Sequence, residues 1–457
     1  MLHACDRSSQ GIGPPRNSVR FRNRIGWTGG GLGAASARAE LYQPLDQALK
    51  SRSTPCTIAP PMNHPFLQAM VFGAALSVAA CGSNSTAPSS TTATPTTTTT
   101  AATLPTATAS GSVAECRLPS SGASVGIGLP RNSLRLPASG DVRLVVLFVD
   151  FPDAPATRSV DSAYALISPT AEAYYRAVSY GKLNLIFQPS LVWRRMSKPS
   201  TEYGWASLTN AAHRAYIQEA VDLAGSAVSY ASAAGIVVIS NPDAGALFNG
   251  PAFASSASSV ISAGGRSFSN AITSGRDLIS WGAYWANHEL GHTLGLPDLY
   301  AIGSSPTHRF VGVFSLMGLI NGPAREYTAW ERWVLGWVSD DQVFCAKTGT
   351  NVTTLSPVER SSGTKMLVVP ISSTQAVVLE SRRAEGYDTG ISSGVLPYLI
   401  DVSLTTGNGP MKMLPLSDTD TSKLTSILTV GTSLTYRSVT ITVVASDSTG
   451  DLIQVVR

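Results

Sequence analysis

The amino-acid sequence predicts an α/β protein in which a mixed sheet with helices is followed by a smaller all-β part. Residues 142–150 and 235–239 are dense in β-branched and apolar residues without helical spacing, which predicts two buried strands. Beyond residue 345 the sequence changes to short strand-like runs. An α/β domain is therefore expected to precede a separate β-rich domain.

Two helices are expected between the buried strands. The first follows Ser168 and Pro169, which supply a cap and a first-turn proline. Its helical face is expected to comprise Ala173, Tyr174, Ala177 and Val178. The second spans residues 209–224 and repeats the helical period through Ala212, Tyr216, Ile217, Ala220 and Leu223. Strand, helix, helix and strand in this order indicate an α/β layer.

The chain divides into five expected parts. Residues 1–61 mix Arg, Gly, Ser and Pro without a period, which is typical of an unstructured extension, and a second candidate start follows at Met62. The other parts are an export signal at 62–81, a Ser/Thr/Pro-rich linker at 82–113, an α/β domain at 114–345 and a β-rich domain at 346–457. In the last domain the expected strands include residues 365–369, 376–380, 395–402 and 439–444.

The export signal ends in a motif that suits lipid attachment. The apolar run after Met62 is too short to span a bilayer permanently and reads as a signal-peptide core. Its last four residues, Val78-Ala79-Ala80-Cys81, resemble the lipobox of bacterial lipoproteins, which implies that Cys81 receives a lipid. The linker behind Cys81 would hold the folded part away from the membrane. A soluble secreted form is the alternative.

Composition excludes one class of partner. The formal charge is +4, only 14% of residues are charged, and no long Lys or Arg run could track a phosphate backbone. Nucleic acid is therefore not an expected partner, and contact with a membrane is expected only through the lipid anchor. The apolar fraction of 43% is enough for a real core. We expect a monomer.

Residues 281–294 predict the helix that carries the chemistry. The side chains at helical spacings of three and four are Trp281, Tyr284, Trp285, His288 and His292. One turn of helix places the last two side by side, so both imidazoles can bind one zinc ion. Glu289 is rotated off that face and can accept a proton from a water at the ion.

Asp298 is the expected third zinc ligand. Gly295 ends the helix, and Asp298 stands three residues further on, where the HExxHxxGxxH pattern has its third histidine. A carboxylate oxygen is an acceptable zinc ligand. Glu326 or Glu331 from a later helical segment is the competing third ligand, and a simple turn aspartate is the alternative role for Asp298.

Several segments together carry a family resemblance. Residues 315–318, Ser-Leu-Met-Gly, look like a Met-turn, which would place Met317 beneath the zinc site. The other segments are residues 149–153, 174–183, 288–300, 330–337, 379–383 and 386–388. Over about residues 140–402 the sequence resembles the immune inhibitor A family of secreted bacterial zinc metallopeptidases.

The resemblance implies a metzincin-like catalytic domain at residues 114–345, with one zinc ion and Glu289 as the general base. It also implies an exported endopeptidase that hydrolyses protein or peptide substrates outside the cell through a zinc-activated water. Ala301 stands where the family commonly has an acidic residue, which argues against a structural calcium ion there. No tyrosine closely follows Met317, so the residue that stabilises the oxyanion is unassigned. The rival functions are a catalytically silent surface binding protein, or adhesin, and a zinc amidase acting on cell-wall crosslinks.

Within residues 114–345, two cysteines and two further histidines remain. Cys116 and Cys345 flank the α/β domain, so we expect them to pair in an oxidising compartment. Two inert thiols, or Cys116 capping the zinc as a thiolate, are the alternatives. His213 is expected to be a satisfied helix histidine, and His308 is expected to face solvent, with a fourth metal contact as its alternative.

Overall fold

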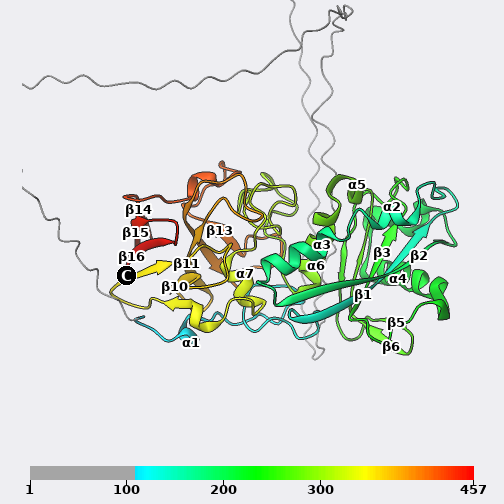
Figure 1. Ribbon diagram of the computed structural model, residues 1–457, viewed down its shortest axis with the longest axis horizontal. Coiled ribbons are helices and arrows are strands. Elements are labelled where there is room, and N and C mark those ends of the chain that lie inside the picture. Colours follow the sequence, from blue (N-terminus) through cyan, green and yellow to red (C-terminus); the bar gives the residue numbers. More distant parts are fainter. Residues whose placement is uncertain (1–108) are drawn as a thin grey trace, which may run out of the picture. The chain divides into compact units, whose positions relative to one another are not determined.

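A computed structural model describes residues 109–457 and shows a mixed α/β protein with several sheets and few helices (Figure 1). The expected N-terminal extension, the export signal with Cys81 and most of the linker lie outside the described residues. Within residues 109–457, no helix combines the length and apolar character needed to cross a bilayer.

The first sheet has five strands in the order β2-β1-β3-β7-β4. Its strands are β1 (Gly140–Asp150), β2 (Leu183–Arg195), β3 (Gly235–Ser240), β4 (Ala252–Ala254) and β7 (Asn270–Thr273). The first four in this order pair in parallel, and β4 pairs with β7 antiparallel. The sheet is therefore mixed, as expected, and β4 is an antiparallel strand at its edge.

Helices cover both faces of this sheet (Figure 1). They are α2 (Val160–Tyr164), α3 (Thr170–Val178), α4 (Asn210–Ala224), α5 (Asp277–Trp281) and α6 (Ala283–Leu294). On β1, Leu144 and Val146 belong to a core with α2, α3 and α6, whereas Val145 and Leu147 belong to a core with α4. This alternation follows from the two-residue period of a strand.

Three details of the expected helices were wrong. The buried face of α3 consists of Ala171, Tyr174, Tyr175 and Val178, whereas Ala173 and Ala177 are exposed. On α4, Leu223 is 43% exposed. The helix expected from Trp281 is interrupted, because Gly282 has a φ of 50° that ends α5, and α6 begins at Ala283.

Two further sheets come from the C-terminal part of the chain. The second sheet has the order β13-β12-β11-β10-β8 and the third has the order β14-β15-β16-β9. Their strands are β8 (Val343–Cys345), β9 (Thr350–Leu355), β10 (Met366–Pro370), β11 (Gln375–Arg382), β12 (Gly394–Asp401), β13 (Met411–Met413), β14 (Ser433–Tyr436), β15 (Val439–Ser446) and β16 (Asp451–Val456).

The remaining elements are short. They are the α-helices α1 (Val113–Cys116) and α7 (Ala329–Val334), the hairpin of β5 (Ile261–Ala263) and β6 (Arg266–Phe268), and 3₁₀ turns at Ser200–Tyr203, Trp205–Ser207, Gly225–Ala227, Asp340–Gln342 and Leu424–Ser426. α1 lies against β8, and the Gly111 N–H donates to the Cys345 carbonyl at 3.2 Å. The folded part thus begins a few residues before 114.

The second sheet is buried on both faces. Leu367, Val377 and Leu399 pack against the third sheet, whereas Val368, Val378 and Tyr398 join the core that also contains α3 and α6. One apolar core therefore runs from the first sheet into the second. Cys116 and Cys345 form a disulfide at this junction, and both are fully buried.

Buried ion pairs connect α7 to the second sheet. Arg382 on β11 is fully buried and donates to Glu380 Oε1 and Asp388 Oδ2, each at 2.6 Å. Glu380 Oε2 accepts the Ala329 N–H at 2.6 Å, and Asp388 Oδ1 accepts the Glu326 N–H at 2.9 Å. The acidic groups therefore satisfy one backbone donor in the first turn of α7 and one in the segment before it, while Arg382 neutralises them.

Replacing Arg382 by Met is expected to lower the free energy of unfolding by about 3 to 5 kcal/mol, because two buried carboxylates lose their counter-charge. Urea unfolding followed by circular dichroism measures the change. The matched control is Arg360→Met, since the Arg360–Glu385 pair is 41% and 43% exposed. That change should cost less than about 1 kcal/mol. If Arg382→Met and Arg360→Met lowered the free energy of unfolding equally, burial would not be the reason for the effect of Arg382→Met.

Candidate metal centre

The three expected ligands converge. His288 and His292 lie one turn apart on α6, and Gly295 ends the helix with a φ of 109°. The Leu296 N–H then donates to the Gly291 carbonyl at 2.9 Å, which folds the chain back along the helix. As a result, Asp298 Oδ1 lies 3.2 Å from His288 Nε2 and 3.3 Å from His292 Nε2.

His288, His292 and Asp298 form the ligand group of the described residues 109–457. Their ligand atoms all lie within 4.8 Å of one another. The carboxyl group of Asp298 and the imidazole of His288 are buried. The His288 and His292 rings are nearly perpendicular, at 89°, with centroids 4.9 Å apart. Two nitrogens and one carboxylate oxygen form a donor set that suits zinc.

Backbone carbonyls orient both imidazoles. The Nδ1 atom of His288 lies 3.0 Å from the Leu316 carbonyl oxygen, and that of His292 lies 2.8 Å from the Leu296 carbonyl oxygen. A carbonyl oxygen can only accept, so each Nδ1 carries a proton. In neutral imidazole the lone pair is then on Nε2, the atom that faces Asp298. Both rings therefore present metal-binding lone pairs to the same point.

The charges of these three side chains favour a cation between them. Burial alone would raise the pKa of Asp298, but the imidazoles of His292 and His288 outweigh it and hold that pKa far below its usual range. Burial opposes a charge on His292, yet the Asp298 carboxylate raises the pKa of this imidazole to about 9. The carboxylate thus stabilises a cation between itself and the imidazoles, whether a proton or a metal ion.

The Met317 side chain packs against α6 at Gly291. A Cβ atom on Gly291 would come within 2.5 Å of Met317 Sδ, so only glycine leaves room for the thioether between the two histidine positions. Ser315 starts the turn with a φ of 66°, and its hydroxyl accepts the Met317 N–H at 3.1 Å. The Leu299 N–H donates to the Met317 carbonyl at 3.0 Å, which ties this turn to the Asp298 segment.

Glu326 and Glu331, the competing third ligands, lie elsewhere in hydrogen-bond networks. Glu331 Oε1 accepts the Ser315 hydroxyl at 2.9 Å, and Oε2 accepts the Thr328 N–H at 2.8 Å in a capping box at the start of α7. Glu326 is paired with the guanidinium of Arg332. Glu331 therefore supports the turn that contains Met317.

Glu289 is partly buried next to the ligand group. Burial raises the pKa of this carboxyl to about 7, although the imidazoles of His288 and His292 pull it downward. A carboxyl with a pKa near neutrality can both accept and release a proton. Its place beside the ligand group, rather than within it, suits a general base.

Sequence reasoning missed Thr406. This residue lies in the loop between β12 and β13, and its hydroxyl hydrogen-bonds with Asp298. It is 108 positions from Asp298, and nothing in the local sequence marks it. Such a partner becomes visible only when the chain is folded.

The other expected residues play different parts. Cys116 is bonded to Cys345 and is not among the converging ligands. His308 is half-buried instead of facing solvent, because Nδ1 donates to the Gly318 carbonyl at 3.1 Å beside the Met317 turn. Its ring centroid lies 6.4 Å from that of Tyr300, which itself lies 6.2 Å from His288. His308 therefore packs near the ligand group without belonging to it.

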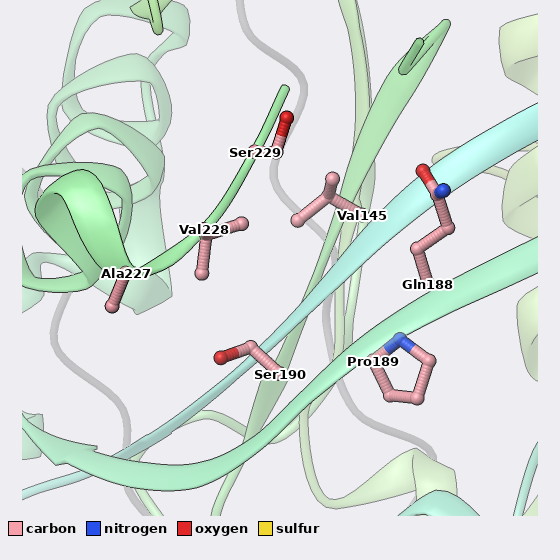
Figure 2. Close-up of a pocket in the computed structure, with 7 residues that line it drawn as sticks. All are labelled: Val145, Gln188, Pro189, Ser190, Ala227, Val228 and Ser229. Atoms are coloured by element: carbon pink, nitrogen blue, oxygen red, sulfur yellow. The ribbon is translucent and has the colours of Figure 1, made fainter. Parts of the chain in front are cut away.

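A separate pocket of about 230 Å³ lies on the face of the first sheet opposite α6. Figure 2 shows Val145 from β1, Gln188, Pro189 and Ser190 from β2, and residues 227–229 from the segment after α4 around it. These side chains include no titratable group, so the pocket offers no acid, base or strong metal ligand. The ligand group is the better candidate for chemistry.

No protein-family model matches the chain, and no curated protein matches it significantly.

Asp298→Ala is expected to weaken zinc binding by more than about 100-fold, since loss of even one hydrogen bond to a metal ligand costs about 10- to 100-fold. Glu331→Gln tests the competing ligand and should weaken zinc binding less, because its carboxylate contacts the turn and the helix cap instead of the ligand group. Competition with a zinc-binding dye measures both dissociation constants. Tight zinc binding by Asp298→Ala together with weak binding by Glu331→Gln would reverse the assignment.

His213 is a buried, hydrogen-bonded histidine, as expected. Its Nε2 lies 2.8 Å from Thr273 Oγ1, and burial lowers its pKa to about 3 from an ordinary value of 6.5. Below pH 6.5 the unfolded chain therefore binds a proton that the folded chain refuses, so acid favours unfolding until the pH approaches 3.

His213→Gln should therefore flatten the acid dependence of stability. In the wild type, each unit by which the pH falls between 6.5 and about 3 lowers the free energy of unfolding by about 1.4 kcal/mol through this histidine. Urea titrations at pH 6 and at lower pH, on both proteins, measure the difference in slope. Equal slopes would show that the imidazole of His213 is protonated in the folded state.

Proposed function

We propose that the protein is a zinc-dependent endopeptidase, with His288, His292 and Asp298 as metal ligands and Glu289 as the general base. The observation that carries the proposal is the position of Asp298 Oδ1, which lies 3.2 Å from His288 Nε2 and 3.3 Å from His292 Nε2. Electron-rich atoms at this distance repel unless a cation lies between them. Their orientation by the Leu316 and Leu296 carbonyls supports a metal ion in that role.

The two separations from Asp298 Oδ1 to the histidine nitrogens suit zinc in particular. Ligand atoms that are about 2.0 to 2.1 Å from a tetrahedral ion lie roughly 3.3 Å from one another. Three protein ligands leave a fourth position, which is the arrangement of catalytic rather than structural zinc sites. Zinc, when bound, polarises a carbonyl group and activates a water molecule.

Glu289 then performs the proton transfers. It takes a proton from the water whose oxygen attacks the scissile carbonyl carbon, and it passes that proton to the departing amide nitrogen. The C–N bond breaks, and a carboxylic acid and an amine are released. The pKa of about 7, raised by burial, suits a group that must first accept and then release a proton.

The edge strand β4 supports a peptide as the substrate. β4 ends the first sheet, and within residues 109–457 the strand order places no further strand on its outer side, where the Ser124 hydroxyl donates to the Ala254 carbonyl. It packs against α6, and Trp285 of α6 donates to the Gly250 carbonyl just before β4 at 2.8 Å. An extended peptide can add to such an edge through main-chain hydrogen bonds. A bound chain would then pass close to the metal helix.

The motifs quoted for the immune inhibitor A family support the same proposal. They include the segment from His288 to Tyr300 and the turn at Met317, so we propose a metzincin-like catalytic part followed by an all-β part. We further propose that the protein acts outside the cell, on a lipid anchor at Cys81 or secreted. The disulfide between Cys116 and Cys345 is typical of proteins that fold in an oxidising compartment.

Glu289→Gln is expected to abolish casein hydrolysis, with a loss of at least about 100-fold in kcat, because the amide of glutamine cannot take a proton from the water. Zinc binding should remain, since Glu289 is not a ligand. Hydrolysis by the wild type should also stop with a chelator and return with zinc. Proteolysis that survives both the substitution and the chelator would exclude the proposed mechanism.

The same assay separates the rival functions. A silent binding protein would hold zinc but hydrolyse neither casein nor cell-wall material. A zinc amidase would cleave isolated cell wall in a chelator-sensitive manner and leave every tested protein intact. The endopeptidase alone degrades casein in a reaction that depends on both zinc and Glu289.

A further inference from the structure

A loop from the C-terminal β part reaches the ligand group. It joins β12 to β13, and three of its contacts are with Asp298. The Asp298 N–H donates to Thr406 Oγ1 at 2.8 Å, and the Thr406 hydroxyl donates to Asp298 Oδ2 at 3.1 Å. The Gly407 N–H donates to the Asp298 carbonyl at 3.1 Å. Backbone and side chain of the third ligand are thus both held by this loop.

The contacts determine which carboxylate oxygen remains for a metal ion. A hydroxyl has one proton, and because Thr406 accepts from the Asp298 N–H, its own proton is available for Oδ2. Oδ2 is therefore engaged, and Oδ1 is the oxygen that faces His288 and His292. A carboxylate held in this way favours ligation through Oδ1 over ligation through both oxygens.

The loop itself is firmly placed. Its first turn is closed by Asp401, whose Oδ1 accepts the Ser403 N–H at 3.0 Å. Gly407 has a φ of 72°, and a Cβ atom there would lie 2.6 Å from Ile302, so the loop packs closely against the segment after Asp298. The Ile302 N–H donates to the Gly407 carbonyl at 3.1 Å. Hydrogen bonds at Asp401 before Thr406 and at Gly407 after it therefore hold the loop in place.

We propose that Thr406 is a positioning residue that holds Asp298 as a one-oxygen ligand, so that the C-terminal β part completes the metal centre. The proposal rests on the proposed zinc site and adds a residue to it. Hydrogen bonds to metal-ligating carboxylates orient the ligand and set the affinity for the ion. The β part is then a component of the catalytic machinery rather than an appended module.

Thr406→Val tests the proposal, because valine has nearly the same shape but no hydroxyl. The zinc dissociation constant, measured by competition with a chelating dye, should rise about 10- to 100-fold. Thr406→Ser keeps the hydroxyl and should restore affinity to within a few-fold of the wild type. Thr405→Val is the matched control: Thr405 is an exposed neighbour whose hydroxyl contacts Asn408 and not Asp298. It should leave zinc affinity unchanged.

Kinetics with saturating zinc provide a second readout. Thr406→Val should lower kcat with little change in KM, because Asp298 orients the ion and not the remote part of a substrate. If Thr406→Val fails to fold, as judged by circular dichroism, Thr406→Ala replaces it, since it removes atoms and adds none. Wild-type affinity in the folded Val or Ala variant would overturn the proposal.

The outcome is separable from that of the proposed function. Absence of zinc binding by the wild type and by all variants would reject the metal site itself. Zinc binding and proteolysis by the wild type, with equal zinc affinity in Thr406→Val, would reject only the role of Thr406. A loss in Thr406→Val that Thr406→Ser does not restore would also reject it, because a hydroxyl effect must return with the hydroxyl.

Discussion

Asp298 Oδ1 lies against the Nε2 atoms of His288 and His292, and the surrounding elements must hold these three polar groups together. These atoms lie 3.2 and 3.3 Å apart, a distance at which they repel unless positive charge is shared among them. The fold supplies what keeps them together. Helical spacing aligns the histidines, the glycine turn at Gly295 returns Asp298, and the Leu316 carbonyl orients His288. Folding thus maintains an arrangement that a cation stabilises.

The support comes from distant parts of the chain. Met317 fills the space beside Gly291, and Glu331 on α7 holds the turn that presents Met317. Glu380 on β11 in turn accepts a backbone N–H at the start of α7, with Arg382 as its counter-charge. A continuous apolar core and a chain of buried hydrogen bonds therefore connect the C-terminal sheet to α6. Burial makes each link of this chain costly to break.

The strands that were predicted correctly are those whose burial in the fold leaves a clear apolar pattern in the local sequence. Both strands expected in the first sheet are present, as β1 and β3, because a strand buried on both faces shows as a run of apolar residues. β2 was missed because Pro189 interrupts its pattern. Proline is tolerated there because β2 lies at the sheet edge. The break at Gly282 was also missed, since apolar spacing continues across it while the backbone does not.

Sequence alone determined the helical pair His288 and His292, the neighbouring Glu289 and the glycine exit toward Asp298, because all of these depend on spacings within one short segment. It left Asp298, Glu326 and Glu331 open as the third ligand. Folding separates the three: Asp298 meets the histidines and contacts Thr406, whereas Glu331 contacts Ser315 and Glu326 pairs with Arg332. The Thr406 contact belongs to the same class: a hydrogen bond across 108 positions depends on how loops pack, which no local periodicity encodes.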